Sequence, residues 1–200
     1  VKFHDVAEKK PELEDEAREW FKKLELGDTE ANALWNKFRA SSILEFQKVY
    51  DLLGIKFDIV SGESLYNKKM EEVVKELKKK HLLIESEGAL IVDLREYDLG
   101  VVIIKKADGT TIYTTRDIAA AIERNKKYKF NLMFYGVGSE QKLHFEQLFK
   151  ILELIGKDWA KNCKHITHGL YLDNDGKKFS TRKGKTVFME DIINESRALA

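Results

Sequence analysis

The segment of residues 130–137 constrains the fold of this chain more than any other feature. Its side chains are almost all apolar, and Gly136 and Gly138 mark its end. Such runs are typical of parallel strands that are buried on both faces. A helix is predicted at about residues 139–155, and a second strand at about residues 165–172. This alternation of strands and helices predicts an α/β fold with a doubly wound sheet.

The residues before this segment predict helices and small hairpins. Apolar residues at helical spacing predict helices over residues 11–23, 28–53 and 67–80, with the apolar stripes of the first two in the core. A short strand is predicted at residues 55–60. Tight turns between apolar runs predict hairpins over residues 82–92 and 101–114. Thr115 is expected to cap the next helix, and a last helix is predicted to start near Asp191.

Composition excludes several classes of protein. The 200 residues are 43% hydrophobic, with 35 basic and 34 acidic residues and a net charge of +1. A basic footprint over the whole chain, as in many nucleic-acid-binding proteins, is therefore missing. Because Cys163 is the single cysteine, we expect neither a disulfide within the chain nor a zinc site. With no bilayer-spanning run and no signal peptide, the sequence predicts a cytoplasmic protein.

The most basic segment of the chain runs from residue 176 to residue 185. Its ten residues hold five cations and two glycines, and no acid occurs between Asp175 and Glu190. Backbone amides freed by glycine, the hydroxyls of Ser180 and Thr181, and clustered cations suit a polyphosphate ligand. A solvated basic loop is the alternative interpretation of this segment.

A second group of candidate residues lies upstream. Tyr113 and Asp117 are four residues apart at a predicted strand-to-helix junction. A carboxylate beside an aromatic ring suits a guanidinium ion, because the carboxylate accepts paired hydrogen bonds. Alternatively, Asp117 lies in the first turn of a helix, where the helix dipole alone favours an acid.

Two further groups lie after the predicted strands. Gly138 lets a ligand approach the backbone, and Gln141 and His144 share one helix face. A structural role is the alternative for this histidine. His165 and His168 lie on a predicted strand without a third ligand at zinc spacing, so we expect no metal site there.

The order of these motifs resembles the catalytic domain of arginyl-tRNA synthetases, which are class I aminoacyl-tRNA synthetases. The motifs are Tyr-x-x-x-Asp-Ile-Ala, Gly-x-x-Gln-x-x-His-Phe, His-x-x-x-Gly and Lys-Phe-Ser-Thr-Arg-Lys-Gly. The last one is similar to the family's KMSKS loop. Phe179 replaces the usual methionine of that loop, and Thr181 stands where many class I enzymes carry a second lysine. Lys183 is a candidate to compensate for that lysine.

The resemblance implies a role for each matching residue. The residues that match the arginine-binding positions are Glu63, Tyr113, Asp117 and Gln141. Those that match the adenosine-binding region are Gly138, His144, Gly169 and Leu170. Those on the loop that holds the ATP phosphates are Lys178, Ser180, Thr181 and Arg182, of which Lys178, Ser180 and Arg182 are the implied catalytic residues.

The resemblance also implies an activity and a domain organisation. The activity is ligation of L-arginine to tRNA(Arg) with Mg-ATP as a substrate, in a monomeric enzyme without a tightly bound cofactor. The fold is the second half of a Rossmann-like catalytic domain with a small inserted α+β element. Residues 1–64 are expected to form helices and a strand of that domain, residues 65–110 the inserted element, and residues 111–200 the second half of the nucleotide-binding fold.

One element of class I synthetases is absent from the sequence, the His-x-Gly-His motif of the ATP site. Together with the unfinished helix at the last residues, this absence predicts a fragment that holds half a catalytic site and is inactive alone. Two alternatives remain. One is a non-catalytic paralogue that serves as a tRNA-binding or interaction module. The other is a nucleotide-binding α/β domain with an unrelated substrate.

Overall fold

The structure is a computed structural model of the 200-residue chain. It describes all residues except 1, 111, 171, 173–175, 177–187 and 200, and all side chains of the others except those of Glu25, Glu63 and Lys68. The chain divides into two compact units, one of residues 60–170 and one of residues 1–59 with 171–200.

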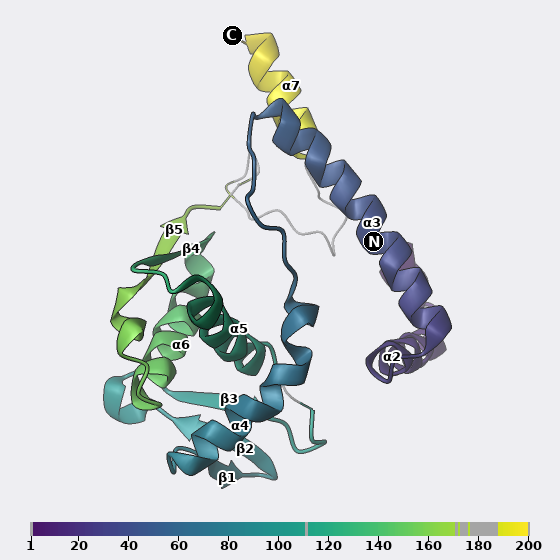
Figure 1. Ribbon diagram of the computed structural model, residues 1–200. Helices are drawn as coiled ribbons and strands as arrows, with labels where there is room; N and C mark the ends of the chain where they lie inside the picture. Colours follow the sequence, from purple (N-terminus) through teal and green to yellow (C-terminus); the bar gives the residue numbers. More distant parts are fainter. Residues whose placement is uncertain (1, 111, 171, 173–175, 177–187, 200) are drawn as a thin grey trace. The chain divides into compact units, whose positions relative to one another are not determined.

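The unit of residues 60–170 contains two small sheets and three α-helices in its described part (Figure 1). Its elements are, in order, η1 (Glu63–Lys69), α4 (Met70–Lys79), β1 (Ile84–Ser86), β2 (Ala89–Asp93), η2 (Arg95–Tyr97), β3 (Val101–Lys105), α5 (Tyr113–Tyr128), β4 (Met133–Gly138), η3 (Ser139–Gln141), α6 (Lys142–Leu154), η4 (Asp158–Asn162) and β5 (Cys163–His168). Strands β1, β2 and β3 form an antiparallel sheet in that order.

Strands β4 and β5 are parallel and lie on either side of α6 in the sequence. Their register pairs Met133 with Cys163 at one end and Gly138 with His168 at the other. This strand–helix–strand unit confirms the predicted parallel strands and the mixed α/β class. Because the strands are parallel, both carboxyl ends meet at the same edge, where ligands bind in open α/β sheets.

A single hydrophobic core joins both sheets to the helices of this unit. Its fully buried members include Leu77 of α4, Ile104 of β3, Ile118 of α5, and Leu148 and Leu152 of α6. Burial of one large aliphatic side chain contributes about 1.5–3 kcal/mol to folding. The position of α5 relative to α6 is therefore set by the same core that holds the β1–β3 sheet.

The structure corrects two predictions near the start of α5. Residues 101–105 pair with β2 rather than with residues 111–114, and the helix already begins at Tyr113. Thr115 is therefore inside the helix and is not its cap. Its buried hydroxyl donates a 2.6 Å hydrogen bond to the carbonyl oxygen of Ile104 and so ties α5 to β3.

The second unit consists of helices in its described part. They are α1 (Lys2–Ala7), α2 (Glu12–Glu25), α3 (Thr29–Leu52) and α7 (Met189–Leu199). Asp28 caps α3 as predicted, since its carboxylate accepts a 2.9 Å hydrogen bond from the amide of Ala31. The predicted strand at residues 55–60 is wrong, because these residues form neither a strand nor a helix.

The predicted core of these first helices is wrong as well. Phe21, Phe38 and Phe46 are 61%, 63% and 56% exposed. Only Ala31 of α3 is buried. A 24-residue helix that carries apolar residues on several faces cannot bury all of them against the shorter α2. Apolar spacing therefore predicted the helices correctly but not their burial. In the described part of the chain, no helix combines the length and hydrophobicity needed to cross a bilayer.

We expect Leu148→Ala to lower the free energy of unfolding by about 2–5 kcal/mol, because it leaves a cavity in this core. Leu143→Ala is the matched control on the same helix, where the side chain is 52% exposed, and it should change stability by less than about 1 kcal/mol. Urea-induced unfolding followed by circular dichroism compares the two variants. Equal losses of stability would contradict this assignment of the core.

Candidate functional site

The first candidate residues lie on the N-terminal turns of α5. Tyr113 is the first residue of this helix and is 57% exposed, while Asp117 follows one turn later and is partly buried. The first turn of α5 contains no acid, so Asp117 lies beyond the positions that the helix dipole favours most. The dipole therefore does not account for an aspartate at this position.

Asp117 is instead paired with His144 of α6. His144 Nε2 lies 2.8 Å from Asp117 Oδ2, and the histidine side chain is only 10% exposed. The ring of Tyr113 lies against the same histidine, with 5.1 Å between the ring centroids. The structure thus brings together three residues from the two separate motifs that the sequence singled out.

Gln141 and Gly138 precede His144 on the same segment. Gly138 ends β4, and Gln141 is the exposed residue that immediately precedes α6. A Cβ atom at Gly138 would lie 3.7 Å from Cε1 of His168, an ordinary contact distance. Neither packing nor a positive φ therefore requires glycine at Gly138, which leaves close approach of a ligand as a reason for it.

The end of β5 lies beside the end of β4. His165 Nε2 is 2.9 Å from the carbonyl oxygen of Val137, and His168 Nδ1 is 2.9 Å from that of Gly169. Both histidines therefore have local backbone partners, as expected for strand residues. Gly169 and Leu170 follow directly and are exposed. In the described part of the chain, no group of three or more His, Cys, Asp or Glu residues could hold a metal ion.

Glu63 opens η1, but its side chain lies outside the description. The position of η1 is fixed by three contacts with α5. Arg116 Nε donates a 3.1 Å hydrogen bond to Asn67 Oδ1, and Lys69 lies 3.8 Å from a carboxylate oxygen of Glu123. The Arg124 guanidinium lies 5.8 Å from the ring centroid of Tyr66.

These contacts hold η1 alongside α5, the helix that bears Asp117. No local pattern predicts these contacts, because they join residues that are 49 or more positions apart. The residues of the basic segment, Lys178, Ser180, Thr181, Arg182 and Lys183, lie outside the described residues.

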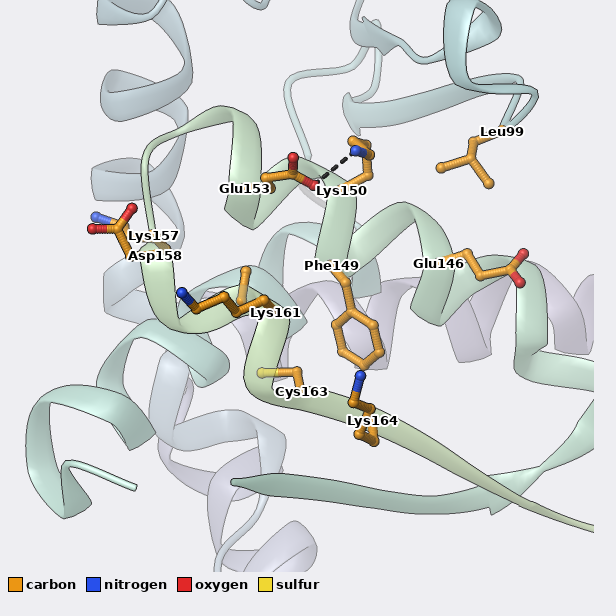
Figure 2. Close-up of a pocket in the computed structure, with 11 residues that line it drawn as sticks. Leu99, Glu146, Phe149, Lys150, Glu153, Lys157, Asp158, Lys161, Cys163 and Lys164 are labelled. Atoms are coloured by element: carbon orange, nitrogen blue, oxygen red, sulfur yellow. Dashed lines mark hydrogen bonds and ion pairs between the residues drawn. The ribbon is translucent and has the colours of Figure 1, made fainter. Parts of the chain in front are cut away.

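A cavity of about 550 Å³ lies at the opposite end of the strands (Figure 2). It is lined by residues of α6, η4 and the start of β5, including Phe149 and Cys163. Lys150 forms an ion pair with Glu153 at its edge, as Figure 2 shows, and Lys157 is paired with Glu76. The lining includes both acidic and basic residues. Because it lies at the start of β5, this cavity is separate from the candidate residues that follow the ends of β4 and β5.

Burial changes the chemistry of two groups in this unit. It raises the pKa of the Cys163 thiol from 9.0 to about 11, because the thiolate would lose its hydration. It also raises the pKa of Tyr135, whose hydroxyl is buried without a hydrogen-bond partner among the described residues. Neither group is thereby prepared to act as a nucleophile or a base at neutral pH.

Comparison with known proteins places the chain in a family. The sequence profile described as "tRNA synthetases class I (R), catalytic domain" matches residues 2–200. The chain belongs to this family of class I tRNA synthetases.

Curated relatives extend this similarity. The arginine–tRNA ligase of Enterococcus faecalis is 54% identical over 200 residues, which cover all of this chain and 35% of the relative. The arginine–tRNA ligase of Clostridium botulinum (strain Alaska E43 / Type E3) is 56% identical over 196 residues, or 98% of this chain and 35% of the relative. The chain thus spans about a third of the length of these class I synthetases.

Solved structures of synthetases agree. Arginyl-tRNA synthetase from Plasmodium falciparum superposes with a TM-score of 0.71 and 28% identity, over 80% of this chain and 28% of that one. The Thermus thermophilus arginyl-tRNA synthetase gives a TM-score of 0.61 at 13% identity, over 86% of this chain and 37% of that one, which is evidence for the fold alone. The family and the fold class predicted from the motifs are therefore confirmed.

Cys163 provides a chemical test of burial near the cavity. We expect iodoacetamide to alkylate it at pH 7.5 at least about tenfold more slowly in the folded chain than in guanidinium chloride, because folding removes both access and thiolate. The rate in the folded chain should rise between pH 9 and pH 11, where the raised pKa places ionisation. As this is the sole cysteine, total labelling by mass spectrometry reports it directly. Similar rates in both states would contradict the burial.

Proposed function

We propose that this chain is part of an arginine–tRNA ligase, which activates L-arginine with ATP and transfers it to tRNA(Arg). The observation that carries the proposal is the grouping of Asp117 and Tyr113 of α5 with His144 of α6. Family membership supports it, as do the names of the two relatives that share more than half of their aligned residues with this chain. Arginine recognition and part of the ATP site can be assigned to residues of this chain.

The reaction needs two transfers. A carboxylate oxygen of arginine attacks the α-phosphorus of ATP, which forms arginyl-adenylate and releases pyrophosphate. A hydroxyl of the terminal ribose of tRNA then attacks the arginyl carbonyl carbon and releases AMP. Such transfers depend on positioning and on neutralisation of charge more than on an acid or a base.

Recognition of the arginine side chain falls to the group on α5 and α6. Asp117 accepts hydrogen bonds from the guanidinium, which is planar and presents its donors in a fixed geometry. Tyr113 adds an exposed ring and hydroxyl beside it. Gln141 lies one turn before His144, and Glu63 opens η1. In this proposal both residues add polar groups around the arginine side chain.

In this proposal, ATP binds at the strand ends and at the basic segment of residues 176–185. Gly138, Gly169 and Leu170 lie where the adenosine passes close to the backbone. Lys178, Ser180, Thr181 and Arg182 hold the phosphates and stabilise the charge that develops on the departing pyrophosphate. Magnesium enters with ATP as part of the substrate. We further propose a cytoplasmic, monomeric parent enzyme.

The alternative of a non-catalytic paralogue receives no support from the comparisons. It predicts decayed motifs, yet Tyr113 and Asp117 of the first motif are both present and contact His144 of the second. We also expect the 200-residue chain by itself to be inactive, because it lacks the His-x-Gly-His motif.

Exchange of pyrophosphate into ATP by the full-length protein tests the function. We expect exchange that requires arginine, measured with and without tRNA(Arg), and no exchange with lysine or citrulline. Both analogues lack the guanidinium, so the acidic site would remain unpaired or mispaired, which costs binding free energy. Equal activity with lysine, or none with any amino acid, would rule out the proposed function.

The substitution Asp117→Asn tests the assigned role of this carboxylate. We expect kcat/KM for arginine to fall by about 10- to 150-fold, which corresponds to the loss of about 1.5–3 kcal/mol for a hydrogen bond between charged groups. Asp158→Asn is the matched control, since Asp158 is an exposed acid on η4 at the far end of the strands. It should leave kcat/KM within about twofold of the unmodified enzyme. Equal effects of the two changes would contradict the role of Asp117.

A further inference from the structure

His144 is a member of the candidate site whose side chain is only 10% exposed and whose contacts are well defined. The family resemblance alone assigns it to the adenosine region. In the structure, however, the contact of its Nε2 atom is with Asp117 Oδ2, at 2.8 Å, and not with a residue of the strand ends. This bond joins α6 to α5 across 27 positions of sequence.

The orientation of the His144 ring is set by aromatic neighbours. The ring centroid of Tyr113 lies 5.1 Å away and that of Phe145 lies 5.2 Å away. Phe145 is itself buried and packs against His165 of β5, with 4.4 Å between the centroids. The direction of Nε2 is therefore set by Phe145, a ring of the core, and by Tyr113 at the start of α5.

An aspartate held in this way differs from a free one. The terminal torsion of an aspartate is broad, so an isolated carboxylate samples many orientations. A donor fixed in place at Oδ2 removes that freedom. Each carboxylate oxygen can accept two hydrogen bonds, and among the described residues only His144 donates to this carboxylate. Oδ1 and the second lone pair of Oδ2 can therefore accept from a substrate. Asp117 is 35% exposed and is therefore accessible to one.

We propose that His144 is a positioning residue for arginine: its Nε2–H donates to Asp117 and fixes the carboxylate in the orientation that a guanidinium needs. This inference rests on the proposed function. It assigns His144 to selection of the amino acid and not to the binding of adenosine. Rotation of the acceptor weakens the binding of a planar guanidinium more than that of a compact cation. The guanidinium must form two parallel hydrogen bonds at once, and both depend on the orientation of the carboxylate.

Three substitutions in the full-length enzyme separate the donor from the ring. His144→Phe keeps an aromatic ring against Tyr113 and Phe145 but removes the donor. His144→Gln places an amide donor at a reach similar to that of Nε2. His144→Asn places the donor closer to the backbone, too short to reach Asp117. Pyrophosphate exchange gives KM for arginine and KM for ATP separately for each variant.

We expect KM for arginine to rise by about tenfold or more in His144→Phe and His144→Asn, with KM for ATP within about twofold. His144→Gln should restore KM for arginine to within about threefold of the unmodified enzyme. In an Asp117→Asn background, His144→Phe should add less than about twofold, because the two residues act as one unit. A double-mutant cycle therefore measures the coupling directly.

Other outcomes would overturn the inference. A rise in KM for ATP with KM for arginine unchanged would assign His144 to adenosine. A lower melting temperature with both constants unchanged would make it a structural residue. Should His144→Phe fail to fold, equal KM values for arginine in His144→Gln and His144→Asn would still contradict a role that depends on reach. Failure of the proposed function is distinct, since the unmodified enzyme would then show no arginine-dependent exchange.

Discussion

The packing of α5 against α6 is the constraint on which the candidate site depends. Ile118 of α5 and Leu148 of α6 belong to one core, and both are fully buried. Asp117 and His144 lie next to that core, so their 2.8 Å contact follows from the way the two helices pack. Groups held on packed helices keep their geometry better than groups on loops. The geometry of the candidate site is therefore only as precise as the hydrophobic core beneath it.

The same helix also positions the element that bears Glu63. Arg116, Glu123 and Arg124 of α5 contact Asn67, Lys69 and Tyr66 of η1. Exposed pairs of this kind contribute little to stability one by one. Their value here is geometric, because three contacts along one helix fix both the position and the direction of η1. A single helix thus organises both acidic positions that the family resemblance associates with arginine.

Much of the fold followed from local sequence patterns. The apolar run at residues 130–137, the Asp28 cap and the spacing of residues 139–155 predicted β4, α3 and α6 within a few residues. The failures have one cause, namely that the outcome depended on distant partners. Residues 111–114 had the composition of a strand, but β3 pairs with β2, and Tyr113 begins a helix. The phenylalanines of α2 and α3 had helical spacing but no partner that buries them in the described part of the chain.

The candidate site shows the same division. The family resemblance assigned Tyr113, Asp117 and Gln141 to arginine and His144 to the adenosine region, and the structure brings His144 into contact with both Tyr113 and Asp117. The partner of Asp117 was not predictable, since nothing local links a residue of α5 to one 27 positions later.

In the proposed function the enzyme must hold a cationic amino acid and an anionic nucleotide side by side. A chain of net charge +1 can do so only if it separates its charges. The acid of the amino-acid site is paired with a histidine on packed helices, whereas the five cations of residues 176–185 occupy a stretch free of acids. In the proposed function, the clustered cations thus bind the phosphates and the carboxylate of Asp117 binds the guanidinium.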